Sequence, residues 1–284
     1  MNYYIIIPAY NEEKFIALTL ESLVSQTILP KKLIIVNDNS TDKTAKIVSD
    51  FSEKYPWILL LNKTSDKIHL PGSKVIQAFQ KGLENIDDNY DLIVKADADL
   101  IFPANYFETI ISHFQSDRNV GMVGGFAYIE KKGKWILENL TDKNHIRGAF
   151  KSYRKETFKQ IGGLQPAMGW DTVDELLCKF YNWKIITDEN LHIKHLKPTG
   201  INYNKTARYK QGEAFYTLGY GFLLTTIAAL KLALKKKKLY LFIDYIRGFW
   251  KAKQKNIPLL VTDEQARFIR KYRWRKIKEK IIKI

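Results

Sequence analysis

The first hundred residues alternate short apolar runs with longer segments in which apolar residues recur every three or four positions. Each short run is typical of a buried β-strand, and each longer segment is typical of an amphipathic helix of about a dozen residues. The runs expected to be strands are Tyr3–Ile7, Leu33–Val36, Trp57–Leu61 and Leu92–Val94. Strands that alternate with such helices predict βαβ units and therefore a parallel sheet.

Residues that favour the first turn of a helix mark where these helices should begin. The first is expected to open at Asn11 as its cap, the second at Ser40 or Thr41, and the third at Pro71 or Ser73. After residue 100 the pattern is less regular. The elements expected there are a helix over 103–114, a strand over 120–130, a turn over 131–134, helices near 156–160 and from Asp171, a last strand at 185–186, and helices from Gln211 onward.

Positive charge is concentrated near the C-terminal end. Residues 197–284 contain 22 Lys or Arg and five Asp or Glu, whereas the whole chain has a net charge of +16. The apolar stretch Phe215–Leu234 has no charge between Glu213 and Lys231, and its length is near the lower limit for a membrane span. Aromatic and aliphatic residues interleaved with Lys and Arg favour an amphipathic anchor on an anionic membrane. The alternative is a helical hairpin whose apolar face packs on the domain formed by the preceding residues.

Composition narrows the class of protein. The chain has 284 residues, 45% of them hydrophobic, which is typical of a globular protein with a large core. Its single cysteine, Cys178, excludes an internal disulfide and a cysteine zinc site and fits a reducing compartment. The run Tyr3–Ile7, interrupted by Pro8, is too short for the apolar region of a signal peptide. We therefore expect a cytoplasmic protein, peripheral on the inner face of the cell membrane.

Two carboxylates separated by one residue follow the strand expected at Leu92–Val94 and its extension through Lys95 and Ala96. In open α/β sheets the ligand crevice lies outside the carboxyl ends of the strands. In an extended segment Asp97 and Asp99 would point the same way. Hard oxygen ligands suit a Mg²⁺ or Mn²⁺ ion that also holds phosphate oxygens. The pattern alone also fits a solvated turn.

Six segments, in this order along the chain, resemble the inverting, nucleotide-sugar-dependent glycosyltransferases of family 2. They are IIIPAYNEE (5–13), VNDNSTDKT (36–44), KADADL (95–100), RGAFKSYRKETFKQIGGL (147–164), GWDTVDELL (169–177) and HLKPTG (195–200). The resemblance implies an α/β GT-A fold, a Rossmann-like and mostly parallel sheet flanked by helices. It implies a catalytic domain over 1–200, with a nucleotide-sugar-binding half over 1–100 and an acceptor half over 101–200. Residues 201–284 would form a basic, amphipathic helical extension.

The same resemblance places donor-binding residues at strand ends. Pro8, Tyr10 and Glu12 would lie in a loop that lines the nucleobase and ribose. Asp38 would accept hydrogen bonds from uracil or a similar base. Lys74 opens a helix whose backbone amides can meet an anion. Glu12 fits equally well as a helix first-turn acid, and the Lys74 segment fits equally well as a simple helix start.

The metal site implied by the resemblance centres on Asp99, which would bind the ion that bridges the diphosphate. Asp97 would contact the ribose or share the metal. His195 would reach the metal or the diphosphate, and His192 is the competing histidine. The implied cofactor is Mn²⁺ or Mg²⁺.

An acidic cluster near residue 171 is the candidate catalytic site. In relatives the second acid of a Glu-Asp pair at a helix start acts as the general base. Here Trp170 takes the first position, which leaves Asp171 as the candidate base. Asp174 and Glu175 follow at i+3 and i+4 and can share its helix face, or they are simple first-turn acids.

Weaker indications concern the acceptor side. Arg147 and Lys151 can contact phosphate on the donor or the acceptor, or they form a solvated face, and Trp170 joins them as a candidate acceptor contact. The expected activity is transfer of a sugar from a UDP-sugar, or next a GDP-sugar, to an acceptor hydroxyl with inversion. The acceptor would be a glycan or lipid-linked molecule, in cell-surface polysaccharide assembly.

Two other functions stay open at this point. A nucleotidyltransferase that makes sugar nucleotides would share a similar sheet, but it normally has a Gly-rich phosphate loop where this chain has Pro8–Glu13. A nucleic-acid-binding protein would use the basic tail but leaves the four aspartates Asp38, Asp97, Asp99 and Asp171 unexplained. We expect no nucleic-acid partner.

Overall fold

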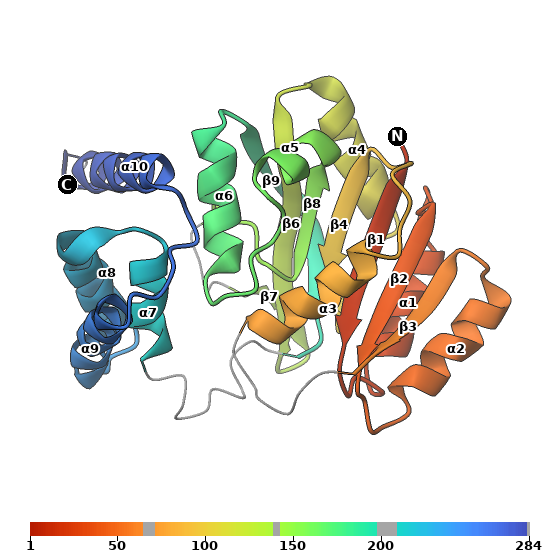
Figure 1. The fold of residues 1–284 in the computed structure, drawn as a ribbon. Coiled ribbons are helices and arrows are strands. Elements are labelled where there is room, and N and C mark those ends of the chain that lie inside the picture. Colours follow the sequence, from red (N-terminus) through yellow and green to blue (C-terminus); the bar gives the residue numbers. More distant parts are fainter. Residues whose placement is uncertain (65–71, 139–142, 198–208, 283–284) are drawn as a thin grey trace. The chain divides into compact units, whose positions relative to one another are not determined.

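The computed structural model describes residues 1–64, 72–138, 143–197 and 209–282 of the chain (Figure 1). Its contacts divide the chain into two compact units. Residues 1–166 and 181–199 form the first, called here the sheet unit. Residues 167–180 and 200–284 form the second, called the helical unit.

Four parallel strands form the first half of the sheet, in the order β3-β2-β1-β4 (Figure 1). Their bounds are β1 Tyr3–Ala9, β2 Lys32–Asp38, β3 Ile58–Lys63 and β4 Leu92–Ala96. β1, β2 and β4 are buried along almost their whole length, which explains why they read as continuous apolar runs rather than alternating ones. The predicted parallel βαβ arrangement is confirmed.

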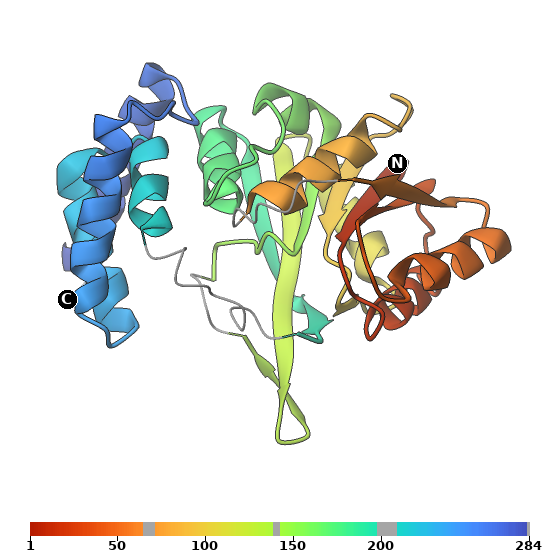
Figure 2. The ribbon, with the colours of Figure 1, turned by 60° about the horizontal axis from the view of Figure 1, so that its bottom comes forward.

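The second half of the sheet is mixed, in the order β4-β8-β6-β9-β5. Its strands are β5 Leu100–Ile101, β6 Val120–Lys131, β7 Lys134–Leu137, β8 Phe150–Arg154 and β9 Lys184–His195. β6 and β7 form a hairpin that projects from the sheet, with its turn at positive φ on Lys132 and Gly133 (Figure 2). The last strand is longer than the predicted 185–186, because it continues to His195 along β6 through a register shift.

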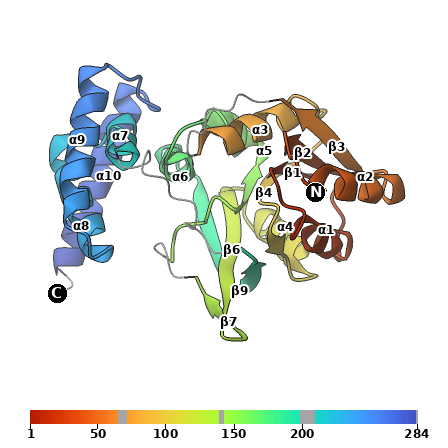
Figure 3. The same ribbon diagram turned by 90° about the horizontal axis from the view of Figure 1, so that it is seen from below.

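Helices cover both faces of this sheet. Their bounds are α1 Ile16–Val24, α2 Thr44–Lys54, α3 Ser73–Leu83, α4 Tyr106–Ser116 and α5 Lys155–Gln160. α3 and α5 lie on one face, and α1 and α4 lie on the opposite face (Figure 3). α3 lies close against the sheet at Gly82, where an added Cβ would lie 2.5 Å from the side chain of Ile6.

Two predicted helix starts are wrong for the same local reason. α1 begins at Ile16 rather than at Asn11, which has a positive φ of 54°. The backbone N–H groups of Asn11 and Glu12 donate to the Ser40 and Thr44 hydroxyls at 3.0 and 2.8 Å. The loops after β1 and β2 are therefore bonded to each other. α1 starts only beyond these bonds, and α2 begins at Thr44, which accepts one of them.

The helical unit contains five helices in its described part. They are α6 Trp170–Phe180, α7 Lys210–Thr217, α8 Gly221–Lys235, α9 Tyr240–Gln254 and α10 Asp263–Ile282. α7 approaches α9 closely, since a Cβ on Gly212 would collide with the carbonyl oxygen of Tyr245. α6 packs against α10 through the rings of Phe180 and Phe268, whose centroids are 5.4 Å apart.

The apolar stretch Phe215–Leu234 is not a single helix. It is interrupted at Gly219, which has a φ of 70° and where a Cβ would lie 2.7 Å from the Cβ of Ala266. Within the described ranges, none of the helices combines the length and the apolar character that crossing a membrane requires.

Candidate active site

The Asp97–Asp99 segment lies at the carboxyl end of β4, at the edge of the sheet where ligands bind in open α/β folds. It is a turn between β4 and β5, so the expectation of an extended segment is wrong, whereas the orientation of the two carboxylates toward one ligand stays a prediction. Asp97 forms an ion pair with Lys95, whose side chain is buried, and it remains one-third exposed. Asp99 is buried and faces His195 instead.

His195 joins Asp99 to two further charged residues. Its Nε2 lies 3.5 Å from Oδ2 of Asp99, and its Nδ1 lies 2.9 Å from Oε2 of Glu138. Glu138 in turn forms an ion pair with Arg147. The side chains of Asp99, Glu138 and His195 are at most one-tenth exposed, so these interactions are shielded from water.

The backbone explains why these groups meet. Leu100 and His195 are paired residues of the antiparallel strands β5 and β9, and the N–H of Leu196 donates to the carbonyl of Asp99 at 2.9 Å. His195 therefore lies beside Asp99 through sheet register. The competing His192 is exposed, and its Nε2 lies 3.1 Å from the Tyr128 hydroxyl and 2.9 Å from the carbonyl oxygen of Glu189.

Asp99 and His195 are the candidate ligands for a divalent cation. In the parts of the chain that the structure describes, no three histidine, cysteine or acidic side chains are grouped closely enough to hold a metal ion by themselves. Asp99 and His195 supply two adjacent ligands. Mg²⁺ in phosphate-transfer sites commonly binds one or two carboxylates and completes its shell with water and phosphate oxygens. The donor set therefore fits a cation that arrives with a diphosphate.

Glu12 provides a further acid at this edge, with 15% of its side chain exposed. Its Oε1 accepts a hydrogen bond from Nζ of Lys197 at 2.9 Å, and its Oε2 is buried without a partner among the described residues. Burial raises the pKa of the Glu12 carboxyl, Lys197 opposes that rise, and the negative charges of Asp99 and Asp97 add to it. Glu12 is therefore close enough to Asp97 and Asp99 for their charges to act on its carboxyl.

The other donor-side candidates occupy the ends of β1 and β2. Asp38 is the last residue of β2, is buried, and lies 3.4 Å from Nζ of Lys63 at the end of β3. Pro8 is within β1, and Tyr10 follows it with 58% of its side chain exposed. Lys74 lies in the first turn of α3, which begins at Ser73 as expected. Their roles in binding a nucleotide stay predictions.

The cations expected near the acceptor are not on a solvated face. Lys151 is fully buried in β8, where it is the register partner of Lys95 in β4. Arg147 is 13% exposed and pairs with Glu138. The solvated-face alternative is therefore wrong for both, whereas contact with phosphate stays a prediction.

The proposed catalytic acids lie on α6, which belongs to the helical unit. Asp171 is half-buried in the first turn, while Asp174 and Glu175 are 1% and 6% exposed. Trp170, the first residue of the helix, is also buried. The predicted helix start is confirmed, and the three acids occupy i, i+3 and i+4 positions on it. Their catalytic role stays a prediction.

Sequence patterns missed Glu138 and Lys63. Glu138 follows the short strand β7 and is 57 residues from His195 in sequence, so only the folded sheet brings them together. Lys63 ends β3, and its proximity to Asp38 follows from the parallel register of β2 with β3. A parallel register could have revealed Lys63, whereas no local signal marks Glu138.

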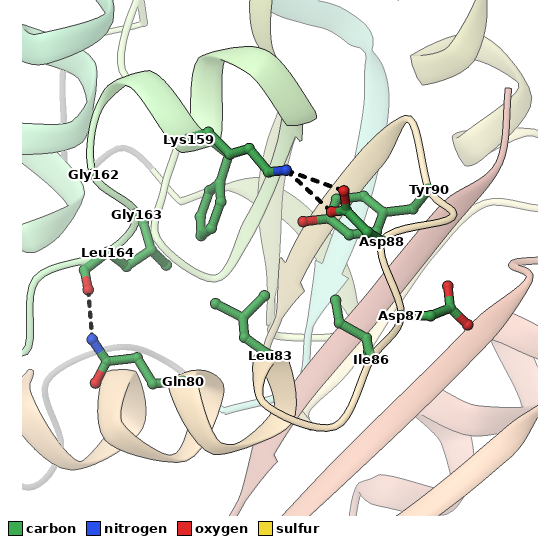
Figure 4. Close-up of a pocket in the computed structure, with 11 residues that line it drawn as sticks. Gln80, Leu83, Ile86, Asp87, Asp88, Tyr90, Lys159, Gly162, Gly163 and Leu164 are labelled. Atoms are coloured by element: carbon green, nitrogen blue, oxygen red, sulfur yellow. Dashed lines mark hydrogen bonds and ion pairs between the residues drawn. The ribbon is translucent and has the colours of Figure 1, made fainter.

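A separate cavity of about 390 Å³ lies near the amino end of β4, away from the Asp97–Asp99 turn (Figure 4). It is bounded by the end of α3, the loop before β4 and the segment after α5. Asp88 pairs there with Lys159 at 3.1 Å, and Gln80 donates to the carbonyl of Leu164 at the same distance. Its acids are already engaged with lysines, and it is not part of the candidate active site.

Comparison with known proteins matches residues 4–169 to the glycosyl transferase family 2 model. Glycosyltransferase GlyA of Streptococcus pneumoniae serotype 4 is 30% identical over 141 residues, which are 49% of this chain and 19% of GlyA. The minor teichoic acid biosynthesis protein GgaA of Bacillus subtilis is 28% identical over 144 residues, 49% of this chain and 31% of GgaA. The chain thus spans less than one-third of the length of either relative.

Solved structures share the fold. The mannosyltransferase PcManGT from Pyrobaculum calidifontis, in complex with GDP-Man and Mn²⁺, aligns with a TM-score of 0.58 at 16% identity, covering 94% of this chain and 78% of that one. TarS 1–349 of S. aureus, in complex with UDP-GlcNAc, aligns with a TM-score of 0.56 at 18% identity, covering 82% and 67%. These likenesses show a shared fold, whereas the match to the family 2 model favours glycosyl transfer over sugar-nucleotide synthesis, the first alternative that the sequence left open.

Proposed function

Because the chain belongs to glycosyltransferase family 2 and has the GT-A fold, we propose that it transfers a sugar from a nucleoside-diphosphate sugar to an acceptor hydroxyl with inversion. The observation that carries the proposal is the buried Asp99–His195 pair at the carboxyl end of β4. Glu12 and Lys197 lie at the same edge of the sheet unit. This edge is where an open α/β sheet binds nucleotides.

Asp99 and His195 would hold Mn²⁺ or Mg²⁺ together with the diphosphate of the donor. When bound, the cation neutralises charge that develops on the leaving nucleoside diphosphate. Asp97 would contact the ribose or share the metal. Lys197 would keep its ion pair with Glu12 and so present one cation beside the phosphates. The complexes of similar fold that contain Mn²⁺ support the choice of a divalent ion.

Asp38 would read the base. A carboxylate accepts hydrogen bonds only, which suits the imide N–H of uracil and the N–H groups of guanine. We rank a UDP-sugar first and a GDP-sugar second. Pro8 and Tyr10 would line the base and ribose beside Asp38, and Lys74 at the start of α3 would meet a phosphate.

Asp171 would act as the general base. An inverting transfer needs one base that takes the proton of the acceptor hydroxyl while the hydroxyl attacks the anomeric carbon. Asp171 is the least buried of the three acids on α6, so it is the most accessible to an acceptor. Asp174 and Glu175 would support the same helix face. Arg147, Lys151 and Trp170 remain the candidate contacts for a phosphate or for the acceptor.

The acceptor is proposed to be a glycan or lipid-linked molecule at an anionic membrane surface, in cell-surface glycan assembly. The name of GgaA as a teichoic acid biosynthesis protein supports a surface polymer. The helical unit also exposes large apolar side chains on α8 and α9. Prominent among them are Phe222, Leu223, Leu230, Leu234, Ile243 and Trp250. With the excess of Lys and Arg in residues 197–284, they form the surface expected of a peripheral membrane protein on the cytoplasmic side.

Release of nucleoside diphosphate tests the proposed activity. The protein would be incubated with a panel of UDP- and GDP-sugars, with Mn²⁺ and with chelator, and free UDP or GDP would be measured. We expect release from at least one UDP-sugar and none in chelator. A rise in the melting temperature on addition of UDP with Mn²⁺ would identify uracil as the nucleobase of the donor even where turnover is slow. Failure of every nucleotide to bind or to be released would contradict the proposal.

A further inference from the structure

The helical unit contains its own cavity of about 400 Å³, within the range of roughly 300–1,000 Å³ typical of small-molecule sites. All of its lining residues belong to the helical unit, from the start of α6 and from α7, α8 and α10. Its floor is apolar, formed by side chains that include Phe215, Leu218, Leu224, Ile227 and Leu232. None of the residues described so far as donor-binding lines it.

Five cations and no acid line this cavity. The cations are Lys231 and Lys235 of α8 and Arg273, Lys276 and Lys280 of α10. Glu279 pairs with Lys276 at 2.7 Å and does not line the cavity. Apolar side chains beside a group of cations have the charge complementarity of an amphiphile whose head group is an anion.

Arg273 adds an independent indication. Its guanidinium lies over the ring of Tyr220, 5.5 Å from the centroid, and both residues line the cavity. Its Nε is buried and has no hydrogen-bond partner within the described part of the chain. A buried donor without an acceptor is costly, and a phosphate that draws the guanidinium toward the cavity would satisfy it.

The cavity also adjoins the candidate general base. Gly169 and Thr172 line it, and they flank Asp171 at the start of α6. The helix start that carries Asp171 is thus one wall of the cavity. A ligand held here would keep any group attached to its phosphate near the first turn of α6.

We propose that this cavity binds a lipid phosphate, with the apolar chain on the floor and the phosphate between Arg273 and the lysines of α8 and α10. It would hold the lipid-linked end of the acceptor, an assignment that rests on the proposed function. The cavity is distinct from the membrane-facing surface on α8. Leu224, Ile227 and Ala228 line the cavity, whereas Phe222, Leu223 and Leu230 are exposed.

Octyl phosphate is the probe that tests this site, because it carries one chain and one phosphate and is used below its micelle concentration. Calorimetry on the full-length protein should detect its binding. Inorganic phosphate and octanol, which each lack one half of the amphiphile, should bind at least tenfold more weakly. Binding of either one as tightly as octyl phosphate would overturn the proposal.

Variants then locate the bound molecule. Arg273→Gln and the double variant Lys231→Gln/Lys276→Gln should each lower the affinity for octyl phosphate at least tenfold, as should Ala228→Trp, which fills the cavity. The matched controls Lys271→Gln/Lys278→Gln on α10 and Leu230→Trp on α8 lie outside the cavity and should bind as the parent does. A cooperative thermal unfolding transition shows that each variant is folded. If Arg273→Gln does not fold, the double variant Lys231→Gln/Lys276→Gln, whose side chains are exposed, tests the site instead.

Three outcomes would overturn the site: no binding of octyl phosphate, equal losses in cavity and control variants, or binding to anionic vesicles without binding of the soluble probe. The last outcome would indicate a surface contact with membrane. UDP binding in Mn²⁺ is measured on the same samples. If the parent protein binds octyl phosphate but not UDP, the result counts against the proposed function alone. If it binds UDP but not octyl phosphate, the result counts against the cavity alone.

Discussion

Nδ1 of His195 lies 2.9 Å from Oε2 of Glu138, and the opposite ring nitrogen of the same histidine faces Asp99 at 3.5 Å. A histidine that donates one N–H to a carboxylate presents its other nitrogen as a lone pair in a fixed direction. Glu138 therefore orients His195 toward the position where Asp99 would share a cation. Arg147 holds Glu138 from the other side.

Replacing Glu138 should weaken the metal-linked part of nucleotide binding without removing a ligand. Loss of a carboxylate that orients a ligating histidine typically costs about 10–100-fold in metal affinity. We expect Glu138→Gln to need about that much more Mn²⁺ to reach the same affinity for UDP. Calorimetric titration of UDP at a series of Mn²⁺ concentrations measures it. Glu130→Gln, an exposed acid at the end of β6, is the control. Equal Mn²⁺ requirements in the two variants would show that Glu138 does not position His195.

Asp171→Asn should bind the donor normally but transfer little sugar. Removing a general base typically lowers the rate by a factor of about 10²–10⁴. Turnover would be followed as nucleoside-diphosphate release in the presence of acceptor, with UDP affinity measured in parallel. Asp174→Asn and Glu175→Gln serve as comparisons on the same helix. If Asp171→Asn turns over normally while one of the comparison variants is inactive, the general base is the acid replaced in that inactive variant.

The hydroxyl of Tyr4 donates to Oδ1 of Asp87 at 2.5 Å, and Asp87 also pairs with Lys32. Burial and the Asp87 carboxylate raise the pKa of Tyr4 to about 12. Because the pKa of Tyr4 is higher in the folded state than in the unfolded state, Tyr4 contributes its full stabilisation of the folded protein below the ordinary tyrosine pKa near 10. That contribution is lost as the pH rises toward 12. Urea unfolding should therefore show that Tyr4→Phe has a smaller free energy of unfolding than the parent at pH 8. The difference between the two free energies should be smaller at pH 11. A difference independent of pH would contradict the linkage.

The helical unit should bring the protein to anionic membranes. Each Lys or Arg near such a surface contributes about 1 kcal/mol, and the exposed side chains of Leu223 and Trp250 can insert. We expect cosedimentation with vesicles containing anionic lipid, weakened by salt and lost on removal of residues 211–284. Leu223→Asp/Trp250→Asp should lose the binding that persists in high salt. Ser116→Asp, a change at the end of α4 in the sheet unit, is the control. A full-length protein that stays in the supernatant at low salt would show that the helices only pack within the molecule.

Periodicity predicted the parallel half of the fold well, because β1, β2 and β4 are buried on both faces and bounded by polar turns. It predicted helix starts poorly at Asn11 and Ser40. The side chains there satisfy backbone groups of a neighbouring loop instead of capping their own helix. Local patterns do not record such contacts between segments.

The sequence predicted only part of the candidate site. The order of the motifs identified Asp99 and His195 as candidates, and the pairing of β5 with β9 places them beside each other. Glu138 could not be found, because its role comes from a contact 57 residues away in sequence. The sequence did not predict the burial of Lys151, because a lysine in a strand that mixes polar and apolar residues is normally expected to face solvent. Charge counts marked the basic tail, but only the packed helices show that five of its cations line one apolar cavity.

Calorimetric titration of UDP, with and without Mn²⁺, tests the central claim most directly when the parent protein is compared with Asp99→Asn. Asp99→Asn keeps the size of the side chain while removing the charge that a cation needs. The account predicts that Mn²⁺ tightens UDP binding by the parent and that Asp99→Asn loses this dependence while retaining the metal-independent affinity. The same gain in affinity from Mn²⁺ in both proteins would contradict the assignment of Asp99 and His195 as the metal-linked nucleotide site.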